Sequence, residues 1–224
     1  QCTDDKRPLP SVNPRSRKSL GLPSKSFVFC SLNNQHKYNP QIFNIWMGLL
    51  KENKDSVIWF LDNGTYSNAN LKKEALKRGV EAERLIFAPK IQNEEHINRM
   101  SQADLFLDSY PCGAHTTASD ALWANLPLIT MSGKSMSSRV AGSILTSIGL
   151  EELITTDFKA YTLLANELCN NQEKLLKIKN KLINNKFKMP LFKSKESSRN
   201  LEKSFRILWK NFLENKPMEN ISIS

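Results

Sequence analysis

Residues His115 to Asp120 bring a histidine, two threonines and an aspartate together directly ahead of an apolar run. If a helix begins here, its free backbone N–H groups and its macrodipole attract phosphate, and the hydroxyls of Thr116 and Thr117 add donors. Asp120 lies one turn beyond Thr116 on the same helical face, where it can accept hydrogen bonds from a ribose diol. This spacing suits a nucleotide. In the alternative interpretation, a threonine only caps the helix and Asp120 only favours its dipole.

Two further polar segments carry groups that could contact such a ligand. Lys37, in LNNQHKY, supplies a cation for a diphosphate, and the sequence has no D-x-D pair of the kind that holds a metal-bound nucleotide. A lysine in a polar loop can equally be a solvated surface residue. His96, in NEEHINR, can contact a ligand, or it can cap a helix or pair with Glu94 or Glu95.

These segments are separated by short apolar runs and amphipathic helices. Strands are predicted at SKSFVFCS, SVIWFL, RLIFAP, DLFLD and PLITMS. Helices are predicted between them and over SSRVAGSILTSIGL, and Asn39 is expected to cap the first of them, with Pro40 in its first turn. Short strands without polar alternation are typical of a parallel sheet covered on both faces. We therefore expect an α/β fold with a Rossmann-like, doubly wound parallel sheet.

This organisation divides the chain into three parts. Residues 1–22 hold three prolines and read as an N-terminal arm or connector. Residues 23–157 form the predicted Rossmann-like core that binds the ligand, and residues 158–224 form C-terminal helices.

In an open parallel sheet, ligands bind outside the carboxyl ends of the strands, and the polar segments fall there. The residues that follow the first, third and fourth predicted strands are Asn33, Asn34, His36 and Lys37, then His96 and Arg99, then His115, Thr116, Thr117 and Asp120. All three histidines of the chain lie in such loops or early helical turns, which is the main indication of a site. Asn33 and Asn34 can also be only turn formers.

The composition and the absence of certain motifs limit the functional classes to which this chain can belong. Of the 224 residues 40% are hydrophobic, which suffices for a packed core, and the net charge of +10 favours polyanions or phosphorylated ligands as partners. No apolar run approaches the roughly 20 residues of a membrane helix and the N-terminus does not resemble a signal peptide, so we expect a cytoplasmic protein without a membrane partner. The sequence contains neither G-x-G-x-x-G nor G-x-x-x-x-G-K-[ST], which argues against an NAD-type dehydrogenase and a P-loop NTPase.

The cysteines show no metal-binding or disulfide pattern. They are scattered without any C-x-x-C pair, so free thiols and no metal site are expected at Cys2, Cys30, Cys112 and Cys169.

The end of the chain is rich in lysine. Between Lys174 and Lys216 cations dominate, and they are interleaved with Phe187, Phe192, Phe205 and Trp209, as in some nucleic-acid binders. Helical spacing favours core packing of the apolar side chains instead, with a solvated basic face. The residues with this spacing are Leu175, Leu176, Ile178, Leu182 and Ile183, then Phe205, Leu208, Trp209 and Phe212. Nucleic acid is therefore not the expected partner.

Three stretches together resemble the C-terminal catalytic lobe of the O-GlcNAc transferase family. They are FVFCSLNNQHKYNP, IFAPKIQNEEHINRMSQADLFLDSYPCGAHTTASDALWANLPLITMSG and SSRVAGSIL, and the resemblance runs from about Pro8 to Phe212. The ordered set is specific, although each stretch alone is not. The resemblance implies a metal-independent GT-B glycosyltransferase in which two Rossmann-like lobes enclose a nucleotide-sugar. It implies no cofactor apart from the UDP-sugar donor substrate, and this chain would be one lobe.

The resemblance also implies roles for individual residues. Lys37 would be the catalytic residue, because the lysine of the family's N-x-x-x-K motif binds the diphosphate and stabilises the leaving group. Asp120 would hold the ribose and Cys112 would lie near the sugar. The implied donor nucleotide-binding residues are Asn34, Lys37, Ile91, His96, Arg99, His115, Thr116, Thr117 and Asp120. Of these, Ile91, His96 and Arg99 would surround the base.

The chain departs from the family in places. The human-type enzyme has glutamine where this chain has Asn34, and lysine where it has Asn93. The N-terminal lobe and the tetratricopeptide repeats that usually precede the matched lobe are missing, so no general base is assigned here. Because the chain begins with Gln1, it can be a processed product or a segment of something longer.

The sequence therefore predicts the donor-binding lobe of a protein glycosyltransferase. It would transfer GlcNAc or another hexose from a UDP-sugar to a side chain of a protein acceptor, and the isolated lobe can be inactive without its N-terminal partner. Two alternatives remain open: a non-catalytic nucleotide-binding module, and a basic nucleic-acid-binding protein whose binding falls steeply with salt.

Overall fold

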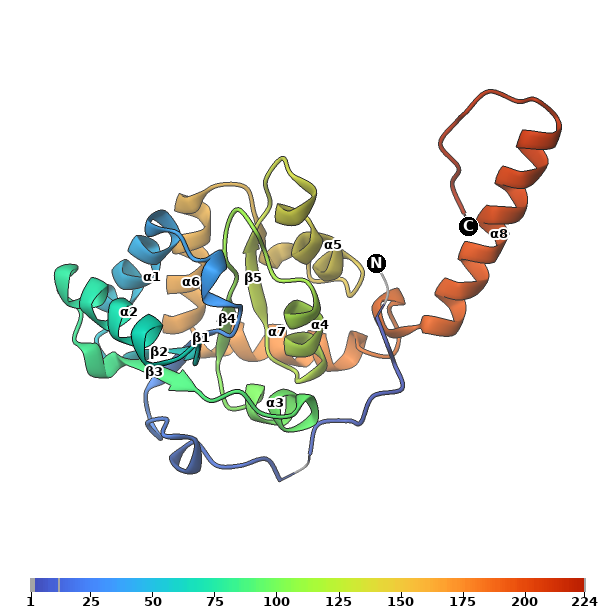
Figure 1. The fold of residues 1–224 in the computed structure, drawn as a ribbon. Coiled ribbons are helices and arrows are strands. Elements are labelled where there is room, and N and C mark those ends of the chain that lie inside the picture. Colours follow the sequence, from blue (N-terminus) through green and yellow to red (C-terminus); the bar gives the residue numbers. More distant parts are fainter. Residues whose placement is uncertain (1–2, 12, 224) are drawn as a thin grey trace.

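A computed structural model describes residues 3–11 and 13–223, and its centre is a six-stranded parallel sheet in the order β3-β2-β1-β4-β5-β6 (Figure 1). The strands are β1 Phe27–Ser31, β2 Ser56–Leu61, β3 Leu85–Ala88, β4 Leu105–Leu107, β5 Leu128–Met131 and β6 Ile154–Thr155. Every neighbouring pair is parallel, and β1 aligns Cys30 with Trp59 of β2 and with Phe106 of β4. The predicted doubly wound α/β fold is confirmed.

Helices cover both faces of this sheet. The helices that pack around the sheet are α1 Pro40–Glu52, α2 Thr65–Lys77, α3 Asn93–Met100, α4 Thr116–Trp123, α5 Val140–Thr146, α6 Phe158–Asn170 and α7 Gln172–Asn185, and a further helix, α8 Ser194–Leu213, follows them. Helix α1 packs against α6 on one face, while α4 packs against α3 and α5 on the other (Figure 1). The buried side chains of β1, β2, β4 and β5 form the core between these layers.

The start of α1 follows the sequence prediction. The side chain of Asn39 accepts a hydrogen bond from the backbone N–H of Ile42 at 2.9 Å, and Pro40 is the first helical residue. Ile42, Trp46 and Leu49 are buried along one side of the helix. Capping and amphipathic spacing therefore fix both where α1 begins and which face it turns to the sheet.

Two elements differ from the sequence prediction. Strand β6 is absent from the prediction, because a segment of only two residues has no periodic pattern. The helix expected over residues 137–150 is shorter: a 3₁₀ turn at Met136–Ser138 precedes α5, which ends at Thr146.

The C-terminal helices differ in burial. Helix α6 buries Tyr161, Ala165 and Leu168, and α7 buries three of the residues expected to pack, namely Leu175, Ile178 and Leu182. Leu176 and Ile183, which were also expected in the core, are exposed. A 3₁₀ turn, η6 Pro190–Phe192, follows α7 and buries Phe192 beside Trp123.

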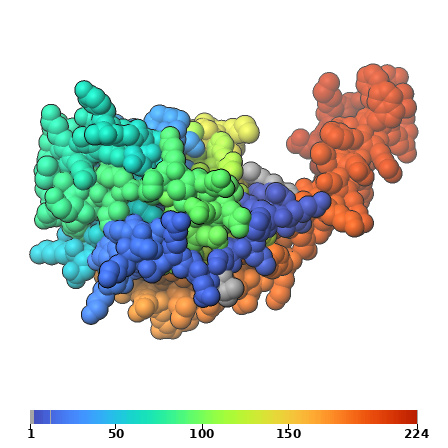
Figure 2. All heavy atoms as spheres, turned by 60° about the horizontal axis from the view of Figure 1, so that its bottom comes forward, coloured from blue at the N-terminus to red at the C-terminus, as the bar shows by residue number. Residues whose placement is uncertain are grey.

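The prediction that the aromatic residues of α8 pack into the core is wrong. Helix α8 has no buried residue, and its apolar side chains face solvent at Phe205, Leu208, Trp209 and Phe212; Phe187 is exposed as well. Figures 1 and 2 show α8 projecting away from the sheet and its helices. Helical spacing reveals an apolar stripe, but it does not show whether this chain itself supplies the surface that covers it.

The N-terminal arm, residues 3–11 and 13–22, lies across the molecule (Figure 2). The carbonyl of Pro8 accepts a hydrogen bond from Trp123 Nε1 at 2.8 Å, and the N–H of Ser11 donates to Asn98 of α3 at 2.6 Å. The arm therefore packs against α3 and α4.

The free thiols predicted at Cys30, Cys112 and Cys169 are present, whereas Cys2 lies outside the described residues. No helix in the described ranges is long and apolar enough to span a bilayer.

The difference in burial between Phe192 and Phe205 predicts that their replacement changes the free energy of unfolding by very different amounts. Phe192→Ala should lower the free energy of unfolding by about 3–5 kcal/mol, because a buried ring is replaced by a cavity. Phe205→Ala on α8 should change it by less than about 0.5 kcal/mol, since that ring is exposed. Urea denaturation of both variants measures the difference, and a large loss with Phe205→Ala would show that α8 packs onto the protein.

Candidate functional site

The carboxyl edge of the sheet is organised by a buried carboxylate, Asp108, directly after β4. Its side chain accepts hydrogen bonds from the backbone N–H groups of Ser109 at 2.8 Å and Ala114 at 2.6 Å. It also accepts from Thr130 Oγ1 at 2.7 Å and from Asn33 Nδ2 at 3.2 Å. Asp108 thereby joins the loop after β1, the β4–α4 loop and β5. Spacing and motifs do not single out Asp108, although DLFLD places an aspartate at the end of an apolar strand.

The environment of Asp108 shifts its titration. Burial raises the pKa of Asp108 to about 6, and the hydrogen bonds from Thr130, Ala114, Ser109 and Asn33 oppose that rise. Above this pKa the carboxylate is ionised, and the hydrogen bonds from these neutral donors stabilise its charge. The hydrogen bonds of the Asp108 side chain therefore stabilise the carboxyl edge of the sheet from inside the protein.

Gly113 lets the β4–α4 loop pass close to this carboxylate. A Cβ atom at residue 113 would lie 2.8 Å from Asp108 Oδ2 and 3.4 Å from the carbonyl of Ser137. The loop carbonyl of Gly113 accepts a hydrogen bond from Lys37 Nζ at 2.8 Å. Residue 113 therefore has to be a glycine, because the loop passes close to the Asp108 carboxylate and to the carbonyl of Ser137.

Lys37 reaches this loop because the turn after β1 is anchored. It ends a 3₁₀ turn, η2 Gln35–Lys37, and the next residue, Tyr38, donates its hydroxyl to the carbonyls of Ser31 at 2.6 Å and Asn33 at 3.0 Å. The solvated-surface interpretation of Lys37 is wrong, because the side chain is half-buried and bonded to the β4–α4 loop. An ammonium group therefore lies beside the segment that leads into α4.

Helix α4 begins without a side-chain cap. Its N-cap residue is His115, whose carbonyl accepts from the N–H groups of Ala118 and Ser119, so the interpretation of Thr116 or Thr117 as the cap is wrong. Within the described residues, the backbone N–H groups of Thr116 and Thr117 have no hydrogen-bond acceptor. His115 Nε2 lies 3.4 Å from the carbonyl of Ser137. The helix thus presents two N–H donors and a positive dipole end.

A cavity of about 390 Å³ opens at this helix. Its lining comes from α3, α4 and the N-terminal arm, namely Thr3, Asp4, Arg7, Asn93, His115, Thr116, Ser119 and Asp120. Asp120 forms an ion pair with Arg7. Burial raises the pKa of Asp120, while the charge and the hydrogen bond of Arg7 lower it. The cavity therefore combines helix donors, hydroxyls and a charged pair.

The residues expected around a base lie to one side of this cavity. Arg99 donates through Nε and Nη2 to His96 Nδ1, at 3.1 and 2.7 Å, and through Nη1 to the carbonyl of Pro89 at 2.6 Å. Burial and the charge of Arg99 lower the pKa of His96 to about 4, so His96 is neutral at physiological pH. The alternative pairing of His96 with Glu94 or Glu95 is replaced by this contact. Ile91 and Arg99 line a separate cavity of about 160 Å³.

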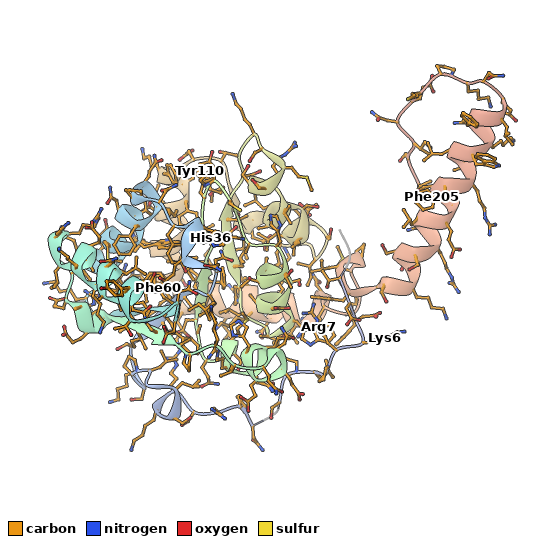
Figure 3. The ribbon with its side chains drawn as sticks, in the orientation of Figure 1. Lys6, Arg7, His36, Phe60, Tyr110 and Phe205 are labelled. Carbon is orange, nitrogen blue, oxygen red and sulfur yellow. The ribbon has the colours of Figure 1, made fainter. Side chains whose placement is uncertain are left out.

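The remaining predicted residues lie at the same edge. Asn34 is exposed and accepts a hydrogen bond from Asn63 Nδ2 at 3.2 Å, and His36 is exposed on the turn before α1 (Figure 3). Cys112 is half-buried, and its carbonyl accepts from Ser109 Oγ at 2.8 Å. In residues 3–11 and 13–223, no group of three His, Cys, Asp or Glu side chains could hold a metal ion.

A larger cavity, of about 680 Å³, lies at the opposite, amino edge of the sheet and contains none of the predicted residues. Asp104 in its wall is paired with Arg17 at 2.7 Å and accepts from the N–H of Val28 at 2.9 Å. In parallel sheets of this type ligands bind at the carboxyl edge. The smaller cavity beside α4 is therefore the candidate site.

The strand order 3-2-1-4-5-6 and the polar carboxyl edge place the chain in the doubly wound α/β class that binds nucleotides at this edge. More particularly, the chain belongs to glycosyl transferase family 41, whose family model matches residues 3–201.

The curated relatives are much longer than this chain. It is 33% identical over 201 residues to a probable UDP-N-acetylglucosamine–peptide N-acetylglucosaminyltransferase of Arabidopsis thaliana, matching 89% of this chain and 20% of that protein. It is 30% identical over 212 residues to the UDP-N-acetylglucosamine–peptide N-acetylglucosaminyltransferase of Caenorhabditis elegans, matching 95% of this chain and 18% of that one. The chain thus spans about a fifth of their length.

Solved structures share the fold. A mutant of the O-GlcNAc transferase of Thermobaculum terrenum superposes with a TM-score of 0.79 at 22% identity, covering 83% of this chain and 36% of that chain. An Anabaena protein in complex with UDP superposes with a TM-score of 0.63 at 12% identity, covering 84% of this chain and 51% of that chain. These matches confirm the GT-B lobe architecture that the sequence predicts.

The close approach at Gly113 can be tested against a second glycine. Gly113→Ala should lower the free energy of unfolding by about 1–3 kcal/mol, because the added methyl group collides with Asp108. Gly48→Ala in α1 is the matched control: nothing lies within 4 Å of its Cβ position, so the variant should gain about 0.5–1 kcal/mol. Equal effects of the two substitutions in urea denaturation would contradict the crowded geometry at Gly113.

Asp108 predicts a particular pH dependence of stability. Its folded-state pKa of about 6 exceeds the unfolded value of 3.8, so the folded protein binds the extra proton between these pH values. As pH rises from about 4 to 6, the wild type should lose stability relative to Asp108→Asn, by up to roughly 1.4 kcal/mol per pH unit. Above pH 6 the difference should level off. Urea denaturation of both proteins from pH 3.5 to 7.5 measures it, and a constant difference would refute the raised pKa.

Proposed function

We propose that this chain is the donor-binding lobe of a protein glycosyltransferase that moves GlcNAc or another hexose from a UDP-sugar to a protein side chain. The observation that carries the proposal is the contact of Lys37 Nζ with the carbonyl of Gly113, next to the uncapped start of α4. A cation and free helix N–H groups in one place are suited to a diphosphate.

Family membership and the names of the relatives support the reaction. The two curated relatives are named for transfer of N-acetylglucosamine from UDP to peptide. They are about five times longer than the region they share with this chain. Activity of the whole protein is therefore proposed to need an N-terminal lobe, and tetratricopeptide repeats are proposed as a further partner.

The proposed chemistry is displacement at the anomeric carbon. The bond from that carbon to the β-phosphate oxygen breaks, a bond to the acceptor side chain forms, and the acceptor's proton passes to a base outside this lobe. Negative charge grows on the departing diphosphate, where Lys37 and the N–H groups of Thr116 and Thr117 stabilise it. No step requires a metal ion or a cofactor.

The other donor contacts follow from the same proposal. His115 and Asn34 lie beside the diphosphate, Asp120 binds the ribose, and Cys112 lies near the sugar. The base occupies the side of the site formed by Ile91, His96 and Arg99. In this arrangement the neutral His96 offers its Nε2–H to a carbonyl of the base, because Nδ1 is occupied by Arg99.

The same proposal assigns a role to each of the three parts of the chain and a cellular compartment to the protein. Residues 1–22 act as an arm, residues 23–157 as the donor-binding core and residues 158–224 as appended helices. The protein works in the cytoplasm on protein acceptors.

Calorimetric titration with UDP tests the proposal. The wild-type chain should bind UDP in preference to GDP, and Lys37→Ala should weaken binding at least about tenfold, because a charge-assisted contact to phosphate is lost. Lys181→Ala is the matched control, since it removes one lysine charge on α7, where Lys181 pairs with Glu152. Its affinity should equal that of the wild type.

The outcomes separate the alternatives. Binding lost with Lys37→Ala, followed by sugar transfer when an N-terminal lobe is added, supports the enzyme. The same binding without any transfer supports a non-catalytic nucleotide-binding module. No UDP binding at millimolar concentration, or equal binding by both variants, contradicts the donor-lobe proposal.

A further inference from the structure

Arg7, on the N-terminal arm, reaches into the candidate site from outside the sheet (Figure 3). Its Nη1 donates to Asp120 Oδ1, and its Nη2 lies 3.2 Å from Thr3 Oγ1 and 3.4 Å from Ser119 Oγ. Its Nε donates to the carbonyl of Asp4 at 3.2 Å. The neighbouring Lys6 points outward in Figure 3. All of the guanidinium nitrogens therefore face the arm and α4.

The flat guanidinium group is also held from its faces. Arg7 Cζ lies 5.1 Å from the ring centre of Trp123 and 5.7 Å from that of Phe192. Only 13% of the Arg7 side chain and 7% of the Asp120 side chain are exposed. A stacked, largely buried arginine has little freedom to turn away from its carboxylate.

The arm itself is fixed on both sides of Arg7. The N–H of Thr3 donates to the carbonyl of Leu191 at 2.8 Å, and Asp5 accepts a hydrogen bond from Ser194 Oγ at 2.5 Å. On the other side, the carbonyl of Pro8 accepts from Trp123 Nε1. These contacts hold Arg7 in register with the second turn of α4.

The partner of Arg7 is the residue proposed to bind ribose. Asp120 is buried, and an isolated carboxylate there would favour its neutral form. Arg7 opposes this and occupies Oδ1, and a hydrogen bond from the Asn93 side chain also lowers the pKa of Asp120. A carboxylate has about four acceptor positions on its two oxygens, so acceptor capacity remains for a diol. Asp120 and Arg7 line the same cavity, together with Thr3 and Asp4.

We propose that Arg7 is a positioning residue of the donor site, which holds the Asp120 carboxylate ionised and aimed at the ribose diol, and that the arm around it forms one wall of the nucleotide pocket. The inference rests on the proposed function. It extends the site from the sheet edge to residues more than a hundred positions away in the chain.

Deoxynucleotides distinguish this role from a merely structural one. The wild-type chain should bind UDP about tenfold more tightly than 2′-deoxy-UDP or 3′-deoxy-UDP, because each analogue lacks a hydroxyl donor for Asp120. Arg7→Met keeps an apolar side chain against Trp123 and Phe192 but removes the charge and the donors. It should weaken UDP binding while leaving the affinity for the more weakly bound analogue nearly unchanged. In this variant the ratio of the affinity for UDP to the affinity for that deoxy analogue should fall toward one.

Two variants control this experiment. Arg78→Met is matched, because Arg78 pairs with Glu74 at 2.5 Å and stacks 5.3 Å from the Phe43 ring, far along the chain from the site. It should keep the wild-type ratio. Arg7→Lys retains the positive charge and should keep part of the discrimination, and it serves in place of Arg7→Met if thermal melting shows that the methionine variant does not fold.

The possible failures are distinguishable. If the wild type binds UDP and Lys37→Ala does not, but Arg7→Met and Arg7→Lys keep the full ratio, the role of Arg7 is overturned and the proposed function stands. A loss of equal size for UDP and both deoxy analogues would show a structural contribution only and would overturn the inference too. If the wild type binds no UDP, both proposals fail together.

Discussion

The hydrogen-bonded carboxylate of Asp108 is the contact on which the carboxyl edge depends. Its side chain joins Asn33, the β4–α4 loop and Thr130, and its backbone carbonyl accepts from the Tyr161 hydroxyl at 2.9 Å. Four segments that are distant in sequence are therefore fixed relative to one another by one residue. The position of Lys37 against Gly113, and the direction in which α4 begins, follow from that arrangement.

The two buried aspartates of this edge are stabilised in different ways. Asp108 is surrounded by neutral donors and faces the interior, whereas Asp120 is paired with the guanidinium of Arg7 and faces a cavity. Neutral donors distributed around a carboxylate rigidify a loop. A single cation leaves acceptor positions open on the other side. One carboxylate thus maintains the shape of the site, and the other can interact with what enters it.

Much of the fold was predictable because its signals are local. Five strands are continuous apolar runs, and Asn39 and Pro40 mark the start of α1. The resemblance and the strand-end rule also selected Lys37 and the start of α4. The roles of Asp108 and Arg7 were not predictable, since their partners lie far away in the sequence, and β6 is too short for a pattern. The exposure of α8 depends on what lies beside it, which periodicity does not record.

The contacts of the arm have a consequence for the order of assembly during synthesis. Arg7 and Asp120 are 113 residues apart, Pro8 and Trp123 are 115 apart, and Asp5 and Ser194 are 189 apart. Neighbouring strands of the sheet pair at separations of at most 76 residues, between Phe29 and Leu105, so their closure costs less entropy than the closure that brings Asp5 to Ser194. The last strand ends at Thr155, so on the ribosome the whole sheet can form before Ser194, the anchor of Asp5, has emerged. The wall of the pocket is completed only when the chain has emerged beyond Ser194.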